Sequence, residues 1–544
     1  MKKIARELGG LLVGEVSDDQ QTREYFSTDG SIFAIEPGLV IYPKSERDVV
    51  LTVKYLDEKA RDGEVIGITA RGKGTDRGGA ALGGGAILVF PAHMKNLVNV
   101  DKKNITVKPG MVYSHLQGIL HSHGRFLPPY PASMDFSTIG GAVANNAAGE
   151  KTVKYGSTRD YVEALRVVLA SGDVIETGRL SKRELAKKKL QDDFEGHIYR
   201  AIDNLIERNK HLIANAEPRT SKNAAGYNLV DVKGRDGSFD LSQLIVGSQG
   251  TLGIVTEVTL KHEEWNPDTM LLAGFFDSTS KAAEAIKAIM PLGPSALEMV
   301  DYHLLDFLKK HKPEQIKGLV PEKLPQIALL VEFDNAKSRV REKKAKRVAK
   351  IFKQLTYDSR YATDPEEQDA LWKIRRGAAA VIWMSSGSKK ALPVIEDGVV
   401  QPDKMPEFLD AVYGLFKRYR LEIAVWGHAG NANFHLQPLM NLSSAKDRGR
   451  ILDLADEFYK LVIKMGGSTS GQHNDGIMRA PYLKRLYGAE MYRLFEEVKQ
   501  IFDPLGILNP NVKIGVTEEY AATKMRHDYS TAHLHDYLPS NYNK

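Results

Sequence analysis

The sequence of 544 residues contains no cysteine. This absence excludes disulfide bridges, thiolate zinc sites and cysteine-ligated iron–sulfur clusters. Long apolar runs are also missing, since none reaches the ~18 residues that a membrane-spanning helix requires. Residues 1–8 have no apolar core of the kind found in a signal peptide. We therefore expect a cytoplasmic protein without an integral membrane segment, and peripheral attachment to a membrane stays open.

The chain also lacks a strong excess of one charge. Its 75 basic and 69 acidic residues leave a formal charge of +6, spread along the whole sequence. This balance indicates solubility and gives no basis for nucleic-acid binding. With 42% apolar residues the chain is long enough to bury more than one core, so two or three domains are expected.

Glycine is concentrated in Arg71-Gly-Lys-Gly-Thr-Asp-Arg-Gly-Gly79, between the apolar runs 65–68 and 86–90. Glycines between two strands let backbone N–H groups line a tight turn, and such a concavity suits a phosphate or diphosphate. An ordinary glycine-rich surface loop is the alternative interpretation. The spacing does not match the Gly-x-Gly-x-x-Gly turn that opens a helix, which disfavours a nicotinamide site.

Two more stretches are rich in small residues. Ser137-Thr-Ile-Gly-Gly-Ala-Val-Ala-Asn-Asn-Ala-Ala-Gly149 lacks the polarity of a linker, and Gly247-Ser-Gln-Gly-Thr-Leu-Gly-Ile254 follows a short apolar run. Such stretches indicate close approach of the backbone to a flat or phosphorylated ligand, although a tightly packed loop–helix junction would have the same composition.

In this order, the three stretches resemble the FAD-linked oxidoreductases of the vanillyl-alcohol oxidase / p-cresol methylhydroxylase superfamily. The resemblance implies an α+β fold, with a two-subdomain FAD-binding domain of the p-cresol methylhydroxylase type and a ferredoxin-like α/β cap domain. It implies non-covalent FAD, because the chain has no cysteine and residues 71–79 contain no histidine. The cofactor-binding residues that it implies are Arg71, Gly72, Lys73, Gly74, Thr75, Ser137, Thr138, Gly140, Gly141, Gly247, Gly250, Thr251, Gly253 and Ile254.

The domain division that we expect has four parts. An N-terminal helical segment covers residues 1–35, and the FAD-binding domain covers residues 36–264. A substrate or cap domain covers residues 265–515, with its last part returning to the FAD-binding domain. Residues 516–544 form a polar tail.

Within the cap, Leu371-Trp-Lys-Ile-Arg-Arg376 resembles the D-2-hydroxyacid dehydrogenase branch of the superfamily, which includes D-lactate, glycolate and D-2-hydroxyglutarate dehydrogenases. We place this stretch at the start of a helix. The resemblance implies that Arg375 holds the substrate carboxylate, a role that suits a guanidinium because it offers two parallel donors. The stretch that begins Glu396-Asp-Gly-Val is interpreted as structural.

Trp426-Gly-His-Ala-Gly-Asn-Ala-Asn-Phe-His435 predicts a hairpin whose turn brings His428 and His435 across from each other. Two imidazoles in this arrangement could hold a divalent metal, and two ordinary hydrogen-bonded histidines are the rival interpretation. Many members of the branch carry an aspartate where this chain has Asn431.

Ser470-Gly-Gln-His-Asn474 resembles the Ser-Gly-Glu-His-Gly motif of the branch. The resemblance implies that His473 is the catalytic base and that Gln472 stands where the third metal ligand would be. Two carboxylates of the motifs are amides here, so a Zn or Mn site at His428, His435 and Gln472 is expected to be weak or absent.

The expected function is that of an FAD-dependent dehydrogenase that oxidises a D-lactate-like D-2-hydroxy acid to the 2-oxo acid. Hydride passes to flavin N5, and the electrons continue to a separate quinone, cytochrome or iron–sulfur acceptor. One alternative is a flavin oxidase or dehydrogenase of another alcohol or sugar acid. A flavin-binding protein without catalytic activity is the alternative from another class.

Overall fold

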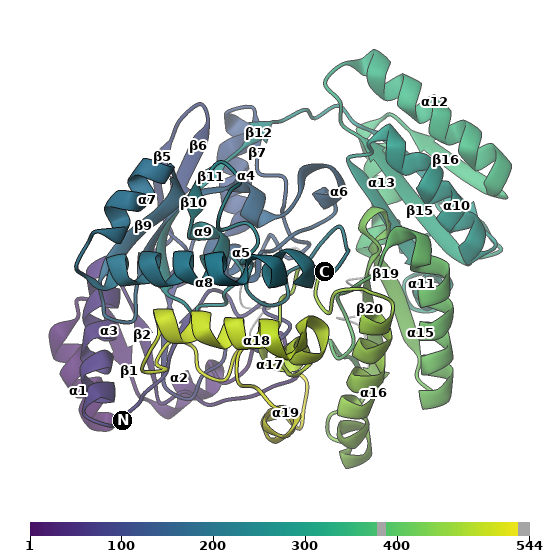
Figure 1. Ribbon diagram of the computed structural model, residues 1–544. Coiled ribbons are helices and arrows are strands. Elements are labelled where there is room, and N and C mark those ends of the chain that lie inside the picture. Colours follow the sequence, from purple (N-terminus) through teal and green to yellow (C-terminus); the bar gives the residue numbers. More distant parts are fainter. Residues whose placement is uncertain (378–387, 531–544) are drawn as a thin grey trace.

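The computed structural model describes residues 1–377 and 388–530. The N-terminal half carries two main sheets and a two-stranded sheet of β7 (Arg125–Phe126) and β12 (Glu263–Glu264), and lies on the left of Figure 1. A further sheet forms the core of the cap on the right. The chain after the cap returns beneath the left half, where it is drawn in yellow. The proposed domain boundary at residue 264 falls directly after strand β12.

The first sheet has the order β1-β2-β4-β3, in which β2 and β3 both run parallel to β4. Helices α1 (Lys2–Leu11) and α3 (Glu46–Arg61) bury apolar side chains against it. Residues 72–79 leave the carboxyl end of β3, which is where open parallel sheets bind ligands. The strands are β1 (Glu15–Ser17), β2 (Leu39–Tyr42), β3 (Ile68–Arg71) and β4 (Ala86–Val89).

The second sheet is antiparallel, with the order β10-β9-β8-β11-β6-β5. Residues 169–173 join β8 and β9 as a hairpin, in which Val168 pairs with Val174. Helices α4 (Tyr113–Ser122) and α8 (Phe194–Ala216) cover its buried face. The strands are β5 (Leu97–Val100), β6 (Asn104–Val107), β8 (Val162–Val168), β9 (Val174–Leu180), β10 (Phe239–Asp240) and β11 (Ile254–Lys261).

The cap is built on an antiparallel sheet with the order β16-β13-β15-β14-β19-β20-β17. These strands are β13 (Met270–Phe276), β14 (Ala296–Asp301), β15 (Ile327–Phe333), β16 (Asp358–Ala362), β17 (Lys390–Ala391), β19 (Ile423–His428) and β20 (Asn433–Met440). One face packs on α10 (Thr279–Ile289), α12 (Ser338–Leu355), α15 (Met405–Tyr419) and α16 (Ala445–Lys464). The other packs on α11 (Tyr302–His311) and α13 (Pro365–Arg376).

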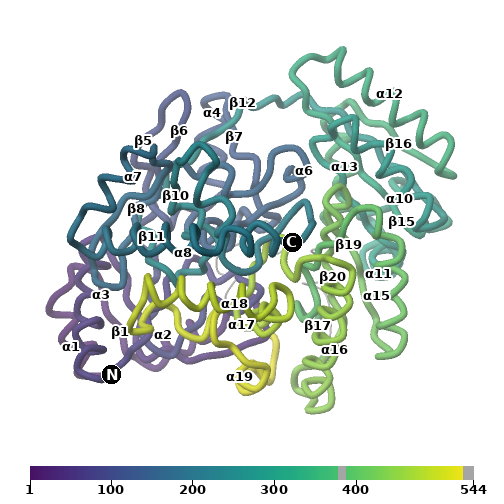
Figure 2. The backbone as a smooth tube through the Cα atoms, viewed as in Figure 1, coloured from purple at the N-terminus to yellow at the C-terminus, as the bar shows by residue number. Residues whose placement is uncertain are grey.

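The segment after the cap returns to the N-terminal half. Helix α18 (Leu483–Phe502) lies beside α8 (Figure 2). The backbone N–H of Ile68 donates to the carbonyl of Ile507, and the N–H of Arg526 donates to the carbonyl of Ile32. These bonds tie residues 507–526 to the first sheet. Among the described residues, no helix is both long and apolar enough to cross a membrane.

Two local predictions are wrong. Leu371–Arg376 lies at the end of α13, because Pro365 and the Asp364 side chain, which accepts from the N–H groups of Glu366 and Glu367, begin the helix earlier. The hairpin of β19 and β20 is present, but Trp426 lies opposite His435 in its register. His428 and His435 are therefore diagonal neighbours, with ring centroids 5.4 Å apart.

Candidate functional site

A cleft lined by glycine backbones opens between the two main N-terminal sheets. We call it the glycine cleft, and its walls come from residues 70–76, residues 138–145 and residues 245–255. Ten of the fourteen predicted cofactor-binding residues line it: Arg71, Gly72, Lys73, Gly74, Thr75, Thr138, Gly140, Gly141, Gly250 and Gly253. Ser137, Gly247, Thr251 and Ile254 are not among the lining residues. The three predicted stretches therefore meet at one place.

The glycines of the cleft occupy positions where a side chain would not fit. A Cβ on Gly72 would lie 2.3 Å from the hydroxyl oxygen of Thr138, and a Cβ on Gly140 would lie 2.6 Å from Pro109. Thr138 caps helix α5 (Ile139–Asn145), with its hydroxyl accepting from the N–H of Gly141. Backbone atoms thus form the wall, as a bound phosphate requires.

Arg71 and Lys73 have different roles in the cleft. The guanidinium of Arg71 donates to the carbonyls of Thr28 and Ala81, so it braces the loop. Lys73 is half-buried, and burial, together with the nearby Lys95, lowers its pKa to about 8. Of the two, the Lys73 ammonium is the cation better placed to meet an anionic ligand.

A second group of polar side chains lies in the cap, where β14, β19 and β20 approach residues 468–479. We call it the histidine cluster, and it consists of His428, His435, His473, Glu298 and Glu396. The ring centroids of His435 and His473 are 5.1 Å apart. The structure therefore brings the predicted base His473 together with the histidines of the predicted hairpin.

Asp397 positions the loop that carries His473. Its carboxylate is fully buried and accepts from the backbone N–H groups of Gln472 and His473, at 3.0 and 2.7 Å, and from the Ser470 hydroxyl. The loop is also joined to the glycine cleft, because the N–H of Ile477 donates to Gly78 and the N–H of Gly476 to the Gln249 side chain. The two sites thus share one rigid connection.

Glu396 pairs with His473, with 2.9 Å between its carboxylate and Nδ1. Arg77 and Arg479 each place a guanidinium nitrogen 3.7 Å from the same carboxylate. Burial alone would raise the pKa of Glu396, but His473 and the two arginines hold it well below its usual value. Glu396 is therefore a permanent anion that orients His473 and leaves the Nε2 of this imidazole for a ligand.

Glu298 joins Arg375 to His428. One carboxylate oxygen accepts from Nε of Arg375 at 2.8 Å, and the other lies 2.8 Å from Nδ1 of His428. Burial raises the pKa of Glu298 to about 6, against the lowering effect of Arg375. Because Glu298 uses Nε, the terminal nitrogens of Arg375 can face a ligand carboxylate.

Burial also lowers the pKa of His428 and of His435 well below the usual value, so both rings are neutral at pH 7. Nδ1 of His428 donates to Glu298, which leaves Nε2 as an acceptor with no hydrogen-bond partner. Nε2 of His435 faces the side-chain nitrogen of Gln472 at 3.2 Å, and the oxygen of Gln472 accepts from Lys222 at 2.9 Å.

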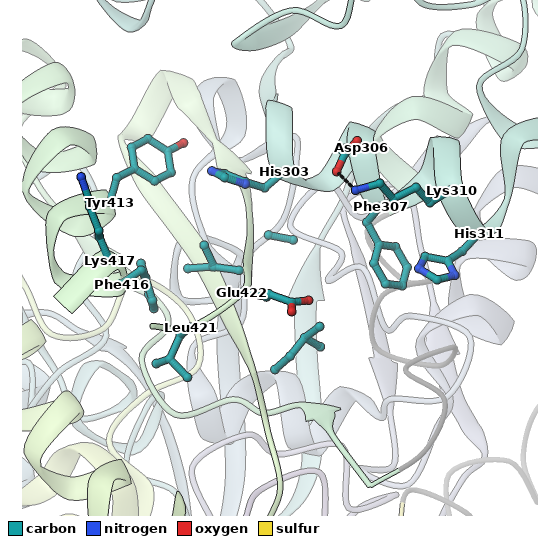
Figure 3. Close-up of a pocket in the computed structure, with 13 residues that line it drawn as sticks. His303, Asp306, Phe307, Lys310, His311, Tyr413, Phe416, Lys417, Leu421 and Glu422 are labelled. Carbon is teal, nitrogen blue, oxygen red and sulfur yellow. Dashed lines mark hydrogen bonds and ion pairs between the residues drawn. The ribbon is translucent and has the colours of Figure 1, made fainter. Parts of the chain in front are cut away.

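Another cavity lies elsewhere in the cap. About 390 Å³ in volume, it is bordered by α11, α15 and the outer ends of β19 and β20 (Figure 3). Asp306 and Lys310 form an ion pair on its wall, and Tyr413 and His303 also face it. None of the predicted site residues lines this cavity, so we assign no role in catalysis to it.

Comparisons with known proteins match two families in succession. Residues 37–178 match the FAD binding domain, and residues 266–512 match the C-terminal domain of FAD linked oxidases. The two matches identify the N-terminal half and the cap as domains of the FAD-linked oxidase type. Both predicted domain types are confirmed, and the FAD-binding match includes two of the three walls of the glycine cleft.

Three curated relatives are 26–29% identical to this chain over the aligned residues. Glycolate oxidase subunit GlcD of Bacillus subtilis (strain 168) is 29% identical over 87% of the chain and 88% of the relative. D-lactate dehydrogenase of Archaeoglobus fulgidus is 27% identical, over 88% and 91%. D-2-hydroxyglutarate dehydrogenase of Pantoea ananatis is 26% identical over 91% of the chain, which spans half of that relative's length.

Solved structures confirm the fold. The crystal structure of p-cresol methylhydroxylase with substrate bound superposes with a TM-score of 0.69, at 15% identity, over 95% of this chain and 97% of the other. At 15% identity this similarity shows a shared fold and carries no conclusion about function. It agrees with the predicted pairing of an FAD-binding domain with an α/β cap.

The residues of the glycine cleft fit FAD. Glycine backbones at Gly72, Gly140 and Gly250 leave room for a diphosphate, and Lys73 supplies a positive charge. When bound, FAD supplies an acceptor for the hydride and for the electrons. Attachment without a covalent bond stays a prediction.

The predicted metal ligands do not fit a divalent ion. The side-chain oxygen of Gln472 already accepts from the Lys222 ammonium, and its nitrogen is the atom that faces His435. Glu396, His435 and His473 are a second candidate set, with ligand atoms within 4.8 Å of one another. Glu396 is already neutralised there by two guanidinium groups, and we derive no step through a metal.

Sequence reasoning missed several residues of the cluster. Glu298 is the only acid in the apolar run 296–300, and a buried acid that is paired with a base often marks a functional site. Glu396 and Asp397 were interpreted as structural. This interpretation fits Asp397, which holds the loop, but not Glu396, which pairs with His473. Arg77 lies in a stretch that resembles the family, whereas Lys222 and Arg479 lie outside the motifs that were singled out, and only the folded chain shows which side chains these residues face.

Proposed function

We propose that the protein oxidises a D-2-hydroxy acid to the corresponding 2-oxo acid, with D-lactate as the first substrate to test. The observation that carries this proposal is the connection from Arg375 through Glu298 and His428 to His435 and His473. A guanidinium and an imidazole therefore lie in one cluster that is joined to the glycine cleft, and these groups suit a carboxylate and a transferable proton. The three relatives, by their names, act on hydroxy acids that carry the hydroxyl beside the carboxylate.

Each residue has a defined part in this reaction. The terminal nitrogens of Arg375 bind the substrate carboxylate through two parallel hydrogen bonds, and Glu298 holds the guanidinium in place. Nε2 of His473 takes the hydroxyl proton, while Glu396 holds Nδ1 and stabilises the imidazolium that forms. FAD, when bound in the glycine cleft, would supply the acceptor for the α-hydrogen as hydride, and correct positioning of the substrate by Arg375 and His473 supplies much of the rate.

The electrons then pass to a separate acceptor, a quinone, a cytochrome or an iron–sulfur protein. Within the described residues, no segment belongs to such a carrier, and the chain has no cysteine to hold an iron–sulfur cluster. Location in the cytoplasm is part of this proposal.

Anaerobic titration of the purified holoprotein tests the function. We expect D-lactate, D-2-hydroxyglutarate or glycolate to bleach the flavin absorbance, with the D-enantiomer at least about 100-fold faster than the L-enantiomer of the same acid. Bleaching by sugar acids or simple alcohols, and by no 2-hydroxy acid, would refute the proposal. Retained FAD with no bleaching by any of these compounds would support the catalytically inactive alternative.

A further inference from the structure

Lys222 occupies an unusual position in the histidine cluster. It lies after helix α8, in the N-terminal half, and its side chain enters the cap. The ammonium donates to the side-chain oxygen of Gln472 at 2.9 Å and to the side-chain oxygen of Asn433 at 3.3 Å. The residue is 5% exposed, so water does not replace these bonds.

The Lys222 ammonium fixes the orientation of the Gln472 amide. An ammonium has only donors, so the amide must turn its oxygen toward Lys222 and its NH₂ group toward His435. The NH₂ group then donates to Nε2 of His435, whose lone pair is used by this bond. A neutral His435 consequently carries its proton on Nδ1, an atom that is buried without a hydrogen-bond partner.

With these hydrogen bonds, only His428 among the three predicted metal ligands presents a lone pair to the site. His428 presents Nε2 as an acceptor, because its Nδ1 donates to Glu298. His435 presents an N–H group, and Gln472 presents its NH₂ group. A divalent ion needs several lone pairs that converge on one point, and here two of the three groups offer hydrogens instead.

The charges around the histidine cluster also disfavour a divalent metal. Lys222 and Arg375 lie on one side, and Arg77 and Arg479 lie on the other. The carboxylates that face them are Glu298, Glu396 and Asp397, which number one fewer than the cations. A dication would add to an excess of positive charge in a buried site.

We propose that the site oxidises its substrate without a divalent metal, and that Lys222 is the positioning residue that makes this possible. By orienting Gln472, it makes His435 a hydrogen-bond donor whose Nδ1 lies 3.9 Å from the Glu396 carboxylate. The substrate hydroxyl then gives its proton to His473, and no metal is needed to hold its oxygen. The part that concerns the substrate oxygen rests on the proposed function, but the metal measurements below do not require a substrate.

Metal analysis of the wild-type holoprotein is the first test. After incubation with Zn²⁺ or Mn²⁺ and removal of free ion with a chelator, we expect less than a tenth of an equivalent of bound metal, on the order expected for a site without convergent ligands. Flavin reduction by the hydroxy acid is expected to be unchanged by the chelator. A full equivalent that survives chelation, or activity lost with the metal, would overturn the proposal.

The Gln472→Glu variant provides the reverse test. One carboxylate oxygen can keep the bond to Lys222, and the other replaces the NH₂ group that faces His435. His435 can then turn a lone pair toward the site, so we expect Zn²⁺ or Mn²⁺ affinity to rise at least about 100-fold, measured by equilibrium dialysis. Unchanged metal affinity in a variant that retains FAD would refute the role assigned to the amide.

Asn474→Asp is the matched control for that variant. Asn474 lies two residues further along the same loop, and the ammonium of Lys513 donates to its oxygen as Lys222 does to Gln472. Its NH₂ group faces backbone carbonyls of Asn145 and Gly247, not an imidazole. We expect no gain in metal affinity. An equal gain would show that added charge, and not the atom facing His435, controls binding.

The positioning role of Lys222 is tested by chemical rescue. Lys222→Ala removes the ammonium and lets the amide turn, and we expect flavin reduction to slow by at least about 10-fold while FAD is retained. Methylammonium should restore part of the rate, whereas tetramethylammonium, which has no N–H donor, should not. If both ions or neither restored the rate in folded, FAD-loaded protein, Lys222 would not act by donating to Gln472.

Discussion

The glycine cleft and the histidine cluster are built in opposite ways. The cleft is made of backbone atoms, and its walls are three continuous stretches of sequence at residues 70–76, 138–145 and 245–255. The cluster is made of side chains from β14, β19, β20 and the loops at 396–397 and 468–479. Substitutions in the glycine cleft should therefore alter FAD binding, whereas substitutions in the histidine cluster should alter turnover and leave FAD bound.

The largest effect on turnover is expected from His473→Gln, which removes the proton acceptor. General base catalysis is worth about 10²–10⁴-fold, so flavin reduction should slow by at least about 100-fold. Because His473 belongs to the histidine cluster and not to the glycine cleft, the FAD content should stay unchanged. The flavin absorbance of the protein after saturation with FAD measures this content. His428→Gln is the matched variant, since His428 is paired with a glutamate in the same way but is neutral and fully buried. Equal losses in both variants would show that His473 is not the base.

Arg375→Lys is expected to lower kcat/KM on hydroxy acids by about 10-fold or more. Lysine keeps the positive charge but loses the paired donors that fix the carboxylate, and it cannot hold Glu298 and the substrate together. Arg376→Lys is the control, because Arg376 is exposed and pairs with Asp369. Steady-state kinetics that show the same loss in both variants would remove Arg375 from the site.

In the cleft, Gly140→Ala is expected to weaken FAD binding by about 10-fold or more, because the new Cβ would press on Pro109 and displace the wall. Turnover of the fraction that still holds FAD should be nearly normal. Gly118→Ala, on helix α4 with open space around it, is the control that should bind FAD as the wild type does. Fluorescence titration of the apoprotein with FAD measures both. A normal affinity in Gly140→Ala would contradict a cleft made by backbone contact.

FAD release tests the attachment of the cofactor. Because residues 71–79 contain no histidine and the chain has no cysteine, acid denaturation should release intact FAD into the supernatant. Chromatography of the supernatant identifies it. Flavin that stays with the precipitated protein would show a covalent bond to another residue.

The smallest effect concerns Asp29, a fully buried acid beside the cleft. Burial and the neighbouring Asp76 raise its pKa to about 7, from an ordinary value near 3.8. The folded protein therefore holds this proton more tightly than the unfolded chain. The associated stability is fully present below about pH 4 and is lost as the pH rises through about 7. Urea unfolding of the apoprotein should show a smaller decline between pH 5 and 8 in Asp29→Asn than in the wild type.

Much of the fold followed from local patterns. Tyr113–Ser122 and Ser338–Leu355 have helical spacing and form α4 and α12. Ser171-Gly-Asp has the turn residues of a hairpin and joins β8 to β9. The start of α13 was misplaced, because the capping residue Asp364 and Pro365 lie outside the motif that was used to locate the helix.

The sequence by itself determined the glycine cleft, since a wall made of backbone needs only small residues in continuous stretches. It also determined the chemical types of Arg375 and His473. Only the tertiary structure decided what surrounds them. Glu298 joins Arg375 to His428 across 77 and 130 residues, and Lys222 reaches Gln472 across 250. The protonation and orientation of a buried side chain depend on such partners, which no local pattern records.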